Sequence, residues 1–377
     1  MINIGEFVRQ LKDIGIERFY GVPDSLLSSL SAYLQEKHSD RNLITANEGN
    51  AVGCSIGSYI STGRPAVVYL QNSGLGNAIN PLISLASGSV LSVPILLVVG
   101  WRGMPGVSDE PQHLAQGAIT RDQLALLGIP VFEVDHKTNV ADVLRGVSEQ
   151  FDTHRSPVAL LVHPNTFEKY SYDFDLKNLG TMSREESIEE IVDQAGDAAI
   201  VATTGKTARE LNEVRLRKGH RNDDLLTVGG MGHAASIALG MAQGAPDQQV
   251  ICLDGDGSLL MHMGGIAVVA SQKNDNLIYV LLNNACHESV GGQPTIAGSI
   301  DFLKLSQSLG FDNYRKALSR LEIAAIFQEY KRSSGTYFIE INIKPGSRKD
   351  LGRPSTSPYE NIDAVMRKMR AVSSYDC

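Results

Sequence analysis

The hydrophobic and polar positions of the chain form two alternating kinds of segment. Short, continuous apolar runs alternate with stretches in which apolar residues recur at helical spacing. In the first half we expect strands at residues 18–22, 43–45, 66–70, 95–99, 131–133 and 158–162. This alternation of strand and helix predicts a parallel sheet that is covered by helices on both faces.

Capping residues mark where two of the helices begin. Asn3 and Glu6 precede an amphipathic segment whose apolar residues lie at positions 7, 8, 11 and 14. Ser183 and Glu186 set up the same arrangement in the second half. A further helix is expected at residues 26–36, directly after the first strand.

The second half repeats the series of strands. They are expected at residues 199–202, 225–228, 249–253, 277–282 and 337–343, after a polar and aromatic stretch at 168–178. The sequence therefore predicts an α/β fold with two similar three-layer domains, each built on a parallel sheet. We place the domains at residues 1–170 and 185–345, joined by a linker at 171–184 and followed by a basic C-terminal tail at 346–377.

The two halves also match each other in detail. One offset along the chain relates serines and glycines at helix, strand and turn positions: Ser55 and Ser236, Gly63 and Gly244, Gly74 and Gly255, and Gly76 and Gly257. A register shared over several elements suggests a duplicated domain. Leu75 stands where Asp256 stands in the second copy, so we expect any metal chemistry in the second half only.

Composition and charge narrow the classes of partner. The net charge of -8 and the isoelectric point near 5.6 argue against nucleic-acid and anionic-membrane partners, so an anionic substrate would need a local basic pocket. The apolar run at residues 90–99 is too short to span a bilayer, and the N-terminus is predicted to be an amphipathic helix rather than a signal peptide. We therefore expect a cytoplasmic protein. The 4 cysteines show no zinc-site spacing.

Oxygen-bearing side chains follow two neighbouring strands of the second half. Asp256 lies between Gly255 and Gly257, and Asn283 and Asn284 end the next strand, so these residues should meet at one edge of the sheet. The two glycines are expected to take positive φ and to let the backbone approach a ligand. A carboxylate, an amide oxygen and a backbone carbonyl suit Mg²⁺ that bridges a diphosphate. Taken alone, a Gly-Asp-Gly turn also ends ordinary strands.

The spacing of this pair resembles the cofactor motif of the thiamin-diphosphate-dependent decarboxylase superfamily. The resemblance implies the thiamin-diphosphate-binding fold, with a pyrimidine-binding domain in the first half and a diphosphate-binding domain in the second. It also implies thiamin diphosphate and Mg²⁺ as cofactors. By the same resemblance the metal ligands are Asp256, Asn284 and the carbonyl of Cys286, and the residues near the diphosphate are Gly255, Gly257 and Ser258.

Two further cofactor contacts follow from the resemblance. Glu48 opens a helix of small residues, where a lone carboxylate could simply complement the helix dipole. In the superfamily, a glutamate at this point shares a proton with the aminopyrimidine ring, which implies a catalytic role for Glu48. Met231 could be a core gap-filler. The superfamily instead implies that Met231 props the cofactor in its bent form and that the Gly229 carbonyl accepts from the aminopyrimidine.

Candidate substrate residues lie on loops after predicted strands. Ser25 belongs to a loop that borders the substrate in the resembled enzymes, and Arg102, Gln112 and His113 follow the strand at 95–99. His113 and His287 are candidates for proton relay, although a lone histidine on a loop is more often only solvated.

Several longer motifs are similar to the phosphonopyruvate decarboxylase family. They lie at residues 20–25, 109–113, 231–234, 287–295 and 348–354. The related sulfopyruvate decarboxylases are usually split into two subunits, so an unsplit chain favours the phosphonate enzymes. Ala285 departs from the pattern, because many relatives carry glycine there.

The leading hypothesis is thiamin-diphosphate-dependent decarboxylation of 3-phosphonopyruvate to phosphonoacetaldehyde and CO₂, in phosphonate biosynthesis. A sulfopyruvate or other 2-oxo-acid decarboxylase is the alternative. A silent, cofactor-binding or regulatory subunit is a third hypothesis; it predicts loss of Glu48 or of the pair Asp256 and Asn284, and all three are present.

The resemblance also implies a partner and a further substrate contact. In the superfamily the cofactor lies between domains of different subunits, so we expect a homo-oligomer, at least a dimer, with active sites at the interface. The tail carries Arg348, Lys349 and Arg353 after the last strand, and Arg353 is a candidate for binding the phosphonate; a solvated tail is the other interpretation.

Overall fold

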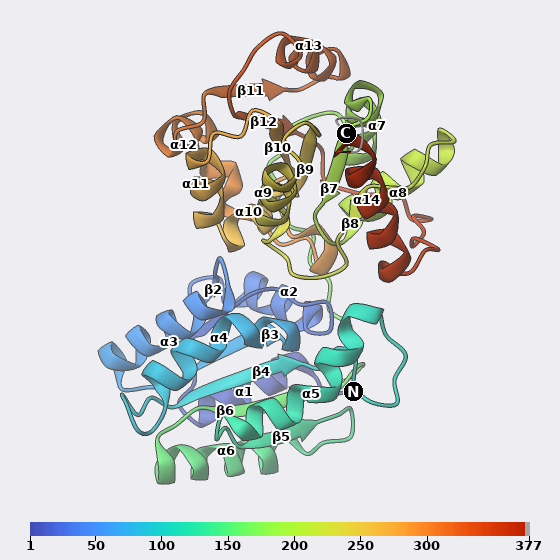
Figure 1. Ribbon diagram of the computed structural model, residues 1–377. Helices are drawn as coiled ribbons and strands as arrows, with labels where there is room; N and C mark the ends of the chain where they lie inside the picture. The colour runs from blue at the N-terminus through green and yellow to red at the C-terminus, as the bar shows by residue number, and fades with distance from the viewer. Residues whose placement is uncertain (374–377) are drawn as a thin grey trace. The chain divides into compact units, whose positions relative to one another are not determined.

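The computed structural model describes residues 1–373, which form two compact units (Figure 1). The first unit comprises residues 1–174 together with 290–293. The second comprises 175–289 and the described residues from 294 onward. Residues 171–180 form neither helix nor strand. The exact domain boundaries at 170 and 185 stay a prediction. Cys377 lies outside the described residues.

The first unit is built on a six-stranded, fully parallel sheet with the order β2-β1-β3-β4-β6-β5. Its strands are β1 (Phe19–Gly21), β2 (Asn42–Ile44), β3 (Ala66–Gln71), β4 (Ile95–Gly100), β5 (Val131–Val134) and β6 (Val158–Val162). Its α-helices are α1 (Ile4–Asp13), α2 (Ser28–Lys37), α3 (Glu48–Thr62), α4 (Leu75–Pro81), α5 (Pro111–Leu126) and α6 (Val140–His154). A short 3-10 turn, η1 (Asn72–Gly74), links β3 to α4.

Alternate residues of each central strand face opposite helical layers. Val67 and Tyr69 of β3 pack with residues of α1, α2 and α6, whereas Val68 and Leu70 pack with residues of α3, α4 and α5. The cap predicted for the first helix is confirmed, because the Asn3 side chain accepts from the Glu6 backbone N–H at 3.0 Å. The result is the expected three-layer arrangement.

The second unit has its own six-stranded, parallel sheet with the order β11-β12-β10-β9-β7-β8. Its strands are β7 (Ala199–Ala202), β8 (Leu225–Leu226), β9 (Val250–Gly255), β10 (Leu277–Asn283), β11 (Asn313–Ala317) and β12 (Tyr337–Asn342). Its α-helices are α7 (Arg184–Ala195), α8 (Lys206–Arg217), α9 (Ala234–Gly244), α10 (Asp256–Met261), α11 (Gly264–Ser271), α12 (Phe302–Leu309), α13 (Arg320–Tyr330) and α14 (Pro358–Ser373).

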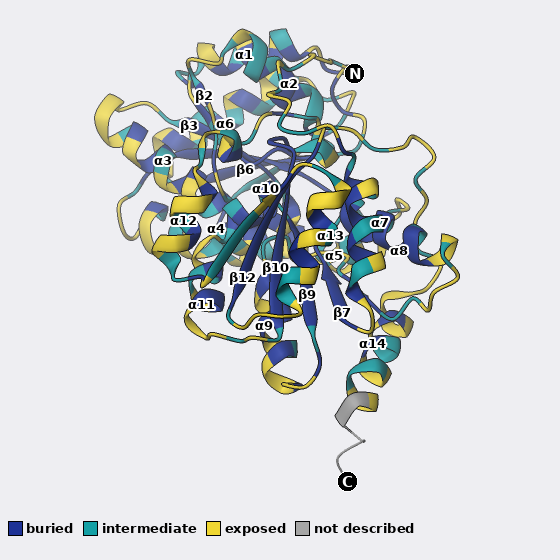
Figure 2. Cartoon of the chain, turned by 90° about the horizontal axis from the view of Figure 1, so that it is seen from above, coloured by how far each residue is buried: buried dark blue, intermediate teal, exposed yellow. Residues whose placement is uncertain are grey.

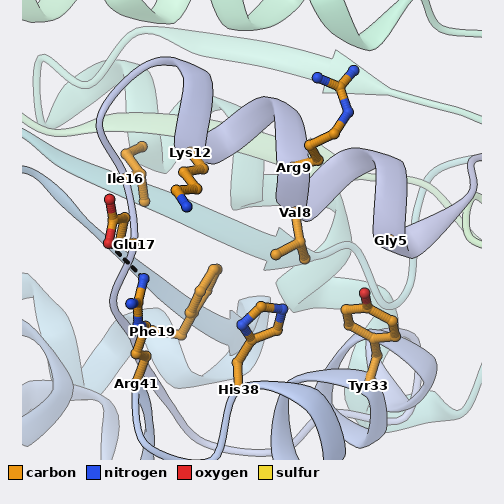
Figure 3. Close-up of a pocket in the computed structure, with 10 residues that line it drawn as sticks. All are labelled: Gly5, Val8, Arg9, Lys12, Ile16, Glu17, Phe19, Tyr33, His38 and Arg41. Atoms are coloured by element: carbon orange, nitrogen blue, oxygen red, sulfur yellow. Dashed lines mark hydrogen bonds and ion pairs between the residues drawn. The ribbon is translucent and has the colours of Figure 1, made fainter.

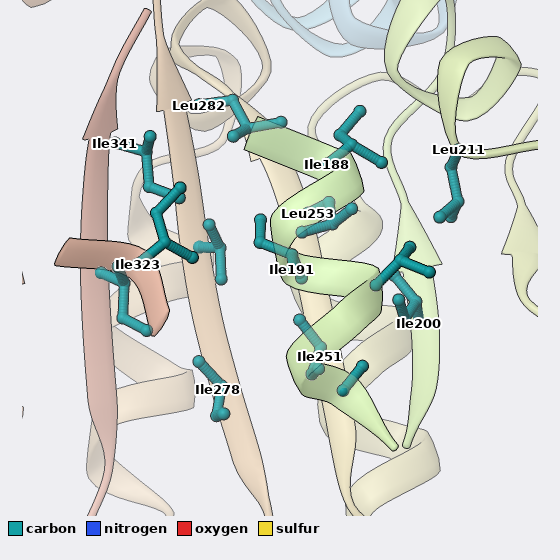
Figure 4. Close-up of a cluster of buried hydrophobic side chains, with 14 of the residues drawn as sticks. Ile188, Ile191, Ile200, Leu211, Ile251, Leu253, Ile278, Leu282, Ile323 and Ile341 are labelled. Atoms are coloured by element: carbon teal, nitrogen blue, oxygen red, sulfur yellow. The ribbon is translucent and has the colours of Figure 1, made fainter. Parts of the chain in front are cut away.

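Two apolar layers also enclose this second sheet. Isoleucine and leucine side chains of α7, α8 and α13 pack against one face of β7, β9, β10 and β12 (Figure 4). Residues of α9, α11 and α12 pack against the other face. The central strands are buried along most of their length, while the helices expose their outer sides (Figure 2). The capping box predicted at Ser183 and Glu186 is present at the start of α7.

The two sheets have the same topology. When the strands of each unit are numbered in chain order, both sheets read 2-1-3-4-6-5. This shared order supports the duplication that the sequence suggests. In each sheet the first and third strands are neighbours, and the connections that follow these two strands run to opposite faces of the sheet. Open α/β sheets bind ligands at the carboxyl ends of such a strand pair.

Two elements near the C-terminus were not predicted. The edge strand β11 is one, and α14, which lies within the expected tail, is the other. The Asn361 side chain of α14 accepts from the Leu226 N–H at 3.0 Å and donates to the Asp224 carbonyl at 2.9 Å, which fixes the helix beside β8. Among the described residues, no helix is long and apolar enough to cross a membrane.

Candidate active site

The site in the second unit begins where β9 passes directly into α10. The strand includes Gly255, and the helix starts at Asp256, so no separate glycine turn exists. The prediction that Gly255 and Gly257 take positive φ is wrong: Gly255 has φ -103°, and neither residue has a positive φ. Gly257 matters because it has no side chain. A β-carbon there would lie 3.1 Å from His287 Nδ1 and 3.3 Å from Met231 Cε.

Asp256 is a buried carboxylate that is bound only by neutral donors. It is 3% exposed, and it accepts from Thr295 Oγ1 at 2.5 Å and from the backbone N–H groups of Gly257 and Asn284. Burial raises the pKa of Asp256 to about 6. Within the described chain, no Lys or Arg forms an ion pair with it. A buried anion without a cationic partner is a suitable ligand for a metal ion.

The residues after β10 complete this edge of the sheet. Asn284 is 4% exposed; its Oδ1 accepts from the Cys286 N–H at 3.1 Å, and its Nδ2 donates to Glu288 Oε2 at 2.9 Å. Burial raises the pKa of the Cys286 thiol to about 12, so the thiol stays protonated at neutral pH. The metal contact that the resemblance implies for Cys286 is its backbone carbonyl oxygen, not its thiol.

These residues fit a hard cation. The described residues contain no cluster of three or more His, Cys, Asp or Glu side chains that could hold a metal ion. A cation at this edge would therefore depend on the Asp256 carboxylate and on neutral oxygens. That donor set suits Mg²⁺ with a diphosphate as its remaining ligand.

The loop after β8 is tied to α10 through Ser258. The Ser258 Oγ accepts from the Gly232 N–H at 3.0 Å and lies 3.0 Å from Thr203 Oγ1, which follows β7. Gly230 and Gly232 have φ of 63° and 88°, and a β-carbon at Gly232 would lie 2.5 Å from His262 Cδ2. This backbone brings Met231 over Gly257, whereas Gly229 is exposed.

His287 lies beside Met231 and Gly257 in this unit. His287 is partly exposed, and burial of its ring lowers the pKa to about 4. A neutral imidazole is therefore expected at neutral pH. The predicted set Met231, Gly257, Asp256, Asn284 and His287 thus comes together at one edge of the second sheet.

A charged cluster next to Asn284 was not recognised from the sequence. Glu288 Oε1 lies 2.8 Å from Lys206 Nζ, and Glu288 Oε2 lies 3.0 Å from Arg184 Nη1. Arg184 also binds Glu210, through Nε to Oε2 at 2.8 Å and through Nη2 to Oε1 at 3.0 Å. Burial disfavours ionisation of Glu288, but the charge of Arg184 and its hydrogen bonds outweigh it and lower the pKa to about 2. The only signal in the sequence is the position of Glu288 four residues after Asn284.

In the first unit, Glu48 is the first residue of α3 and is 5% exposed. Asn77 Nδ2 donates to Glu48 Oε2 at 2.8 Å, and the Asn47 side chain caps the helix by accepting from the Asn50 N–H. Burial raises the pKa of Glu48, and the Asn77 hydrogen bond opposes this only in part. Burial therefore favours the protonated form of Glu48 more than it would in an exposed carboxyl group.

In the first unit, Arg102 contacts the predicted substrate residue Ser25 and is held by Asp109. Its Nη1 donates to Ser25 Oγ at 2.7 Å, while its Nε and Nη2 bind Asp109 at 2.8 and 2.5 Å. Burial is the main cause that lowers the pKa of His113, and the positive charge of Arg102 lowers it further. Gln112 precedes His113 in the first turn of α5. Asp109 therefore takes up two donors of the guanidinium and fixes its orientation beside Ser25.

The basic segment after β12 is partly engaged with helices of the second unit. Arg348 pairs with Glu185 at 2.7 Å, with Glu213 and with Asp350 at 3.2 Å. The Gly352 N–H donates to Glu213 Oε1 at 2.6 Å, so the segment lies against α7 and α8. Arg353 is exposed.

A separate pocket of about 230 Å³ lies in the first unit (Figure 3). Residues of α1, of the end of α2 and of the amino end of β1 line it, among them Lys12, Phe19, Tyr33 and His38. Glu48, Ser25 and Arg102 follow the carboxyl ends of strands, at the other edge of the same sheet. The pocket therefore contains none of the predicted site residues.

Comparison with known proteins agrees with this arrangement. Residues 5–126 match the N-terminal TPP binding domain of the thiamine pyrophosphate enzymes, and residues 203–341 match their C-terminal TPP binding domain. The chain is 32% identical over 393 residues to a phosphonopyruvate decarboxylase of Streptomyces hygroscopicus, covering 98% of this chain and 94% of that one. It is 30% identical over 388 residues to a phosphonopyruvate decarboxylase of Streptomyces viridochromogenes, covering 98% and 95%.

A third relative corrects one expectation. A sulfopyruvate decarboxylase of Methanosarcina acetivorans is 28% identical over 375 residues and covers 93% of both chains. An unsplit chain is therefore found among sulfopyruvate decarboxylases too, and chain length does not separate the two activities. The identity over nearly the full length is higher with the phosphonate enzymes. The chain belongs to the phosphonopyruvate decarboxylase family of thiamine pyrophosphate enzymes.

Proposed function

We propose that the chain is a carboxy-lyase that converts 3-phosphonopyruvate to phosphonoacetaldehyde and CO₂. The full-length similarity to two phosphonopyruvate decarboxylases carries this proposal. In the reaction, the bond between the keto carbon and the carboxylate breaks, CO₂ leaves, and a proton takes its place. Thiamin diphosphate, when bound, supplies a nucleophilic carbon and an electron sink for this chemistry.

We further propose that Asp256, the Asn284 side-chain oxygen and the Cys286 carbonyl hold Mg²⁺ at the diphosphate. The burial of Asp256 without a cationic partner supports this assignment, since a divalent ion would supply the missing positive charge. Gly255, Gly257 and Ser258 would lie around the same diphosphate. Met231, which packs over Gly257, would support the bent cofactor, and the Gly229 carbonyl would accept from its aminopyrimidine.

For Glu48 we propose proton exchange with the ring nitrogen of the aminopyrimidine. Its burial and the raised direction of its pKa support this role, because a buried carboxyl group that holds its proton more tightly than an exposed one can share that proton with a weakly basic nitrogen. His113 and His287 are proposed to relay protons to the reacting carbon. Burial is the main cause that lowers the pKa of both imidazoles, and it favours the neutral form of each ring, in which one nitrogen is a proton acceptor.

The substrate is proposed to contact Ser25, Arg102, Gln112, His113 and Arg353. Arg102 is held by Asp109 beside Ser25, which supports a fixed, positively charged contact for an anionic substrate. Because Asp109 compensates part of this charge, Arg353 is proposed to add the second cation that a phosphonate needs.

Two further proposals concern assembly and location. The chain is proposed to act as a homo-oligomer, at least a dimer, in which Glu48 of one subunit and Asp256 of another serve the same cofactor. The cytoplasmic location expected from the sequence stays a prediction.

The products of three substrates would test the proposed activity. The protein, with thiamin diphosphate and Mg²⁺, is incubated separately with phosphonopyruvate, sulfopyruvate and pyruvate, and the products are identified by mass spectrometry. We expect phosphonoacetaldehyde to form fastest, and no aldehyde in parallel reactions with Glu48→Gln. Faster turnover of sulfopyruvate would favour the runner-up activity, and no turnover of any 2-oxo acid would favour a non-catalytic subunit.

A further inference from the structure

We infer that Glu288 is a positioning residue for the metal site, because its carboxylate orients the Asn284 amide so that the oxygen, not the nitrogen, is available to a cation. The inference rests on the proposed Mg²⁺ site and extends it to a residue outside the proposed ligands. Only the amide oxygen can bind Mg²⁺, whereas an Asn side chain can present either end after a half-turn.

Asn284 is held at both ends of its amide. Nδ2 donates to Glu288 Oε2 at 2.9 Å, and Oδ1 accepts from the Cys286 N–H at 3.1 Å. An ionised carboxylate is an acceptor only, so it accepts the NH₂ end and repels the oxygen end. If the amide were flipped, Asn284 Oδ1 would face the Glu288 carboxylate, and both groups are acceptors. The Asn284 NH₂ group would face the Cys286 N–H, and both groups are donors. The amide oxygen is therefore kept beside the backbone of Cys286, which carries the other proposed neutral ligand.

Glu288 is itself fixed by two cations from other elements. Lys206, the first residue of α8, lies 2.8 Å from Oε1, and Arg184, the first residue of α7, lies 3.0 Å from Oε2. The two helices start at the same edge of the sheet. Their first residues therefore hold the Glu288 carboxylate beside Asn284, which directly follows β10. Outer-shell partners of this kind orient metal ligands in many metalloproteins.

Glu210 provides a matched control within the same cluster. It is buried and binds Arg184 with two hydrogen bonds, as Glu288 binds Arg184 and Lys206. It has no hydrogen bond to Asn284 in the described structure. Glu210→Gln therefore perturbs the ion-pair cluster without removing the acceptor that orients the amide.

The test measures the apparent Mg²⁺ affinity through cofactor binding. After treatment with a chelator, binding of thiamin diphosphate is followed by calorimetry over a range of Mg²⁺ concentrations, with thermal melting as the check on folding. We expect Glu288→Gln to weaken the apparent Mg²⁺ affinity by about tenfold to a hundredfold, because a glutamine can pair with either end of the amide. Glu288→Asp keeps the charge but withdraws the carboxylate, and we expect a similar loss if Glu288→Gln does not fold. Glu210→Gln should keep the parental affinity.

An Asn284→Asp background separates orientation from charge. An aspartate has two equivalent oxygens and no wrong orientation, so Glu288→Gln should no longer weaken Mg²⁺ binding there and should strengthen it by removing a like charge.

An equal loss in both backgrounds, or an equal loss in Glu210→Gln, would overturn the positioning role. If Asp256→Ala abolishes Mg²⁺-dependent binding while Glu288→Gln binds as the parent does, only this inference fails. If Asp256→Ala leaves Mg²⁺ dependence unchanged, the proposed metal site fails as well.

Discussion

Gly74 and Glu48 approach so closely that a β-carbon at position 74 would lie 2.1 Å from Glu48 Oε1. Gly74 has φ -74° and ψ -11°, a conformation open to any residue, so the backbone does not require glycine here. The absence of a side chain matters because the turn after β3 packs directly on the buried carboxylate.

Gly74→Ala should therefore displace the Glu48 carboxylate. We expect kcat for phosphonopyruvate to fall by about a hundredfold, because displacement of a reacting group by about 1 Å has this cost. Gly76→Ala, two residues later, is the control, since a β-carbon there meets nothing within 4 Å. Both variants would be checked by circular dichroism. Parental kcat in a folded Gly74→Ala enzyme would show that the position of Glu48 is not critical.

Asp256→Ala should abolish activity and cofactor retention together, because it removes the charged oxygen ligand proposed for Mg²⁺. Equilibrium dialysis with thiamin diphosphate, with and without Mg²⁺, measures the loss. Asp254→Asn changes a neighbouring buried carboxylate that accepts from the Tyr279 hydroxyl at 2.9 Å, and it should lower the melting temperature more than the cofactor affinity. Unchanged cofactor affinity in Asp256→Ala would count against the site.

Activity should return when two inactive variants are mixed. Glu48→Gln and Asp256→Ala damage residues that are proposed to serve one cofactor from different subunits, so some mixed oligomers would contain an intact pair. Subunit exchange would be verified with two affinity tags, and each variant alone is the control. Verified exchange without any return of activity would rule out the shared site.

Arg353→Ala should lower kcat/KM for phosphonopyruvate by about tenfold to a hundredfold or more, because a charged hydrogen bond contributes on the order of 1.5–3 kcal/mol. Residual turnover of pyruvate should change little, because pyruvate lacks the phosphonate. Arg348→Ala is the control from the same segment: its ion pairs with Glu185 and Glu213 predict a loss of stability instead. Equal losses on both substrates would move the phosphonate site elsewhere.

Ala285→Gly should stabilise the protein. Ala285 has φ 55°, in the left-handed region that favours glycine, although glycine also gains more freedom in the unfolded chain. We expect the free energy of unfolding to rise by about 0.5–1 kcal/mol, measured by urea denaturation. Ala141→Gly, on the exposed side of α6, should change the free energy in the opposite direction. A loss of stability in Ala285→Gly would contradict the strain at this position.

The strands with continuous apolar runs were predicted best. The predicted bounds of β6 and β7 agree with the structure at both ends, and every residue of these strands is buried. The edge strand β11 was missed because its sequence, Asn-Tyr-Arg-Lys-Ala, is polar and only its last residue is buried. An edge strand has one paired side, and its pattern therefore resembles that of a loop.

The site could be predicted where it depends on the ends of neighbouring strands. Asp256 and Asn284 follow β9 and β10, and their meeting follows from parallel pairing alone. The cluster of Arg184, Lys206 and Glu288 could not be found in this way, because it depends on where two helices begin in space. The prediction of positive φ at Gly255 and Gly257 was wrong because α10 starts directly after β9, without a turn between them.

The arrangement of the strands along the chain also bears on how the protein is made. All six strands of the first sheet precede residue 171, and all six of the second follow residue 180. All strands and helices of the first sheet are therefore synthesised before β7. The nascent first half can cover both apolar faces of this sheet while translation continues. Of the first unit, only residues 290–293 must wait for the second half to emerge.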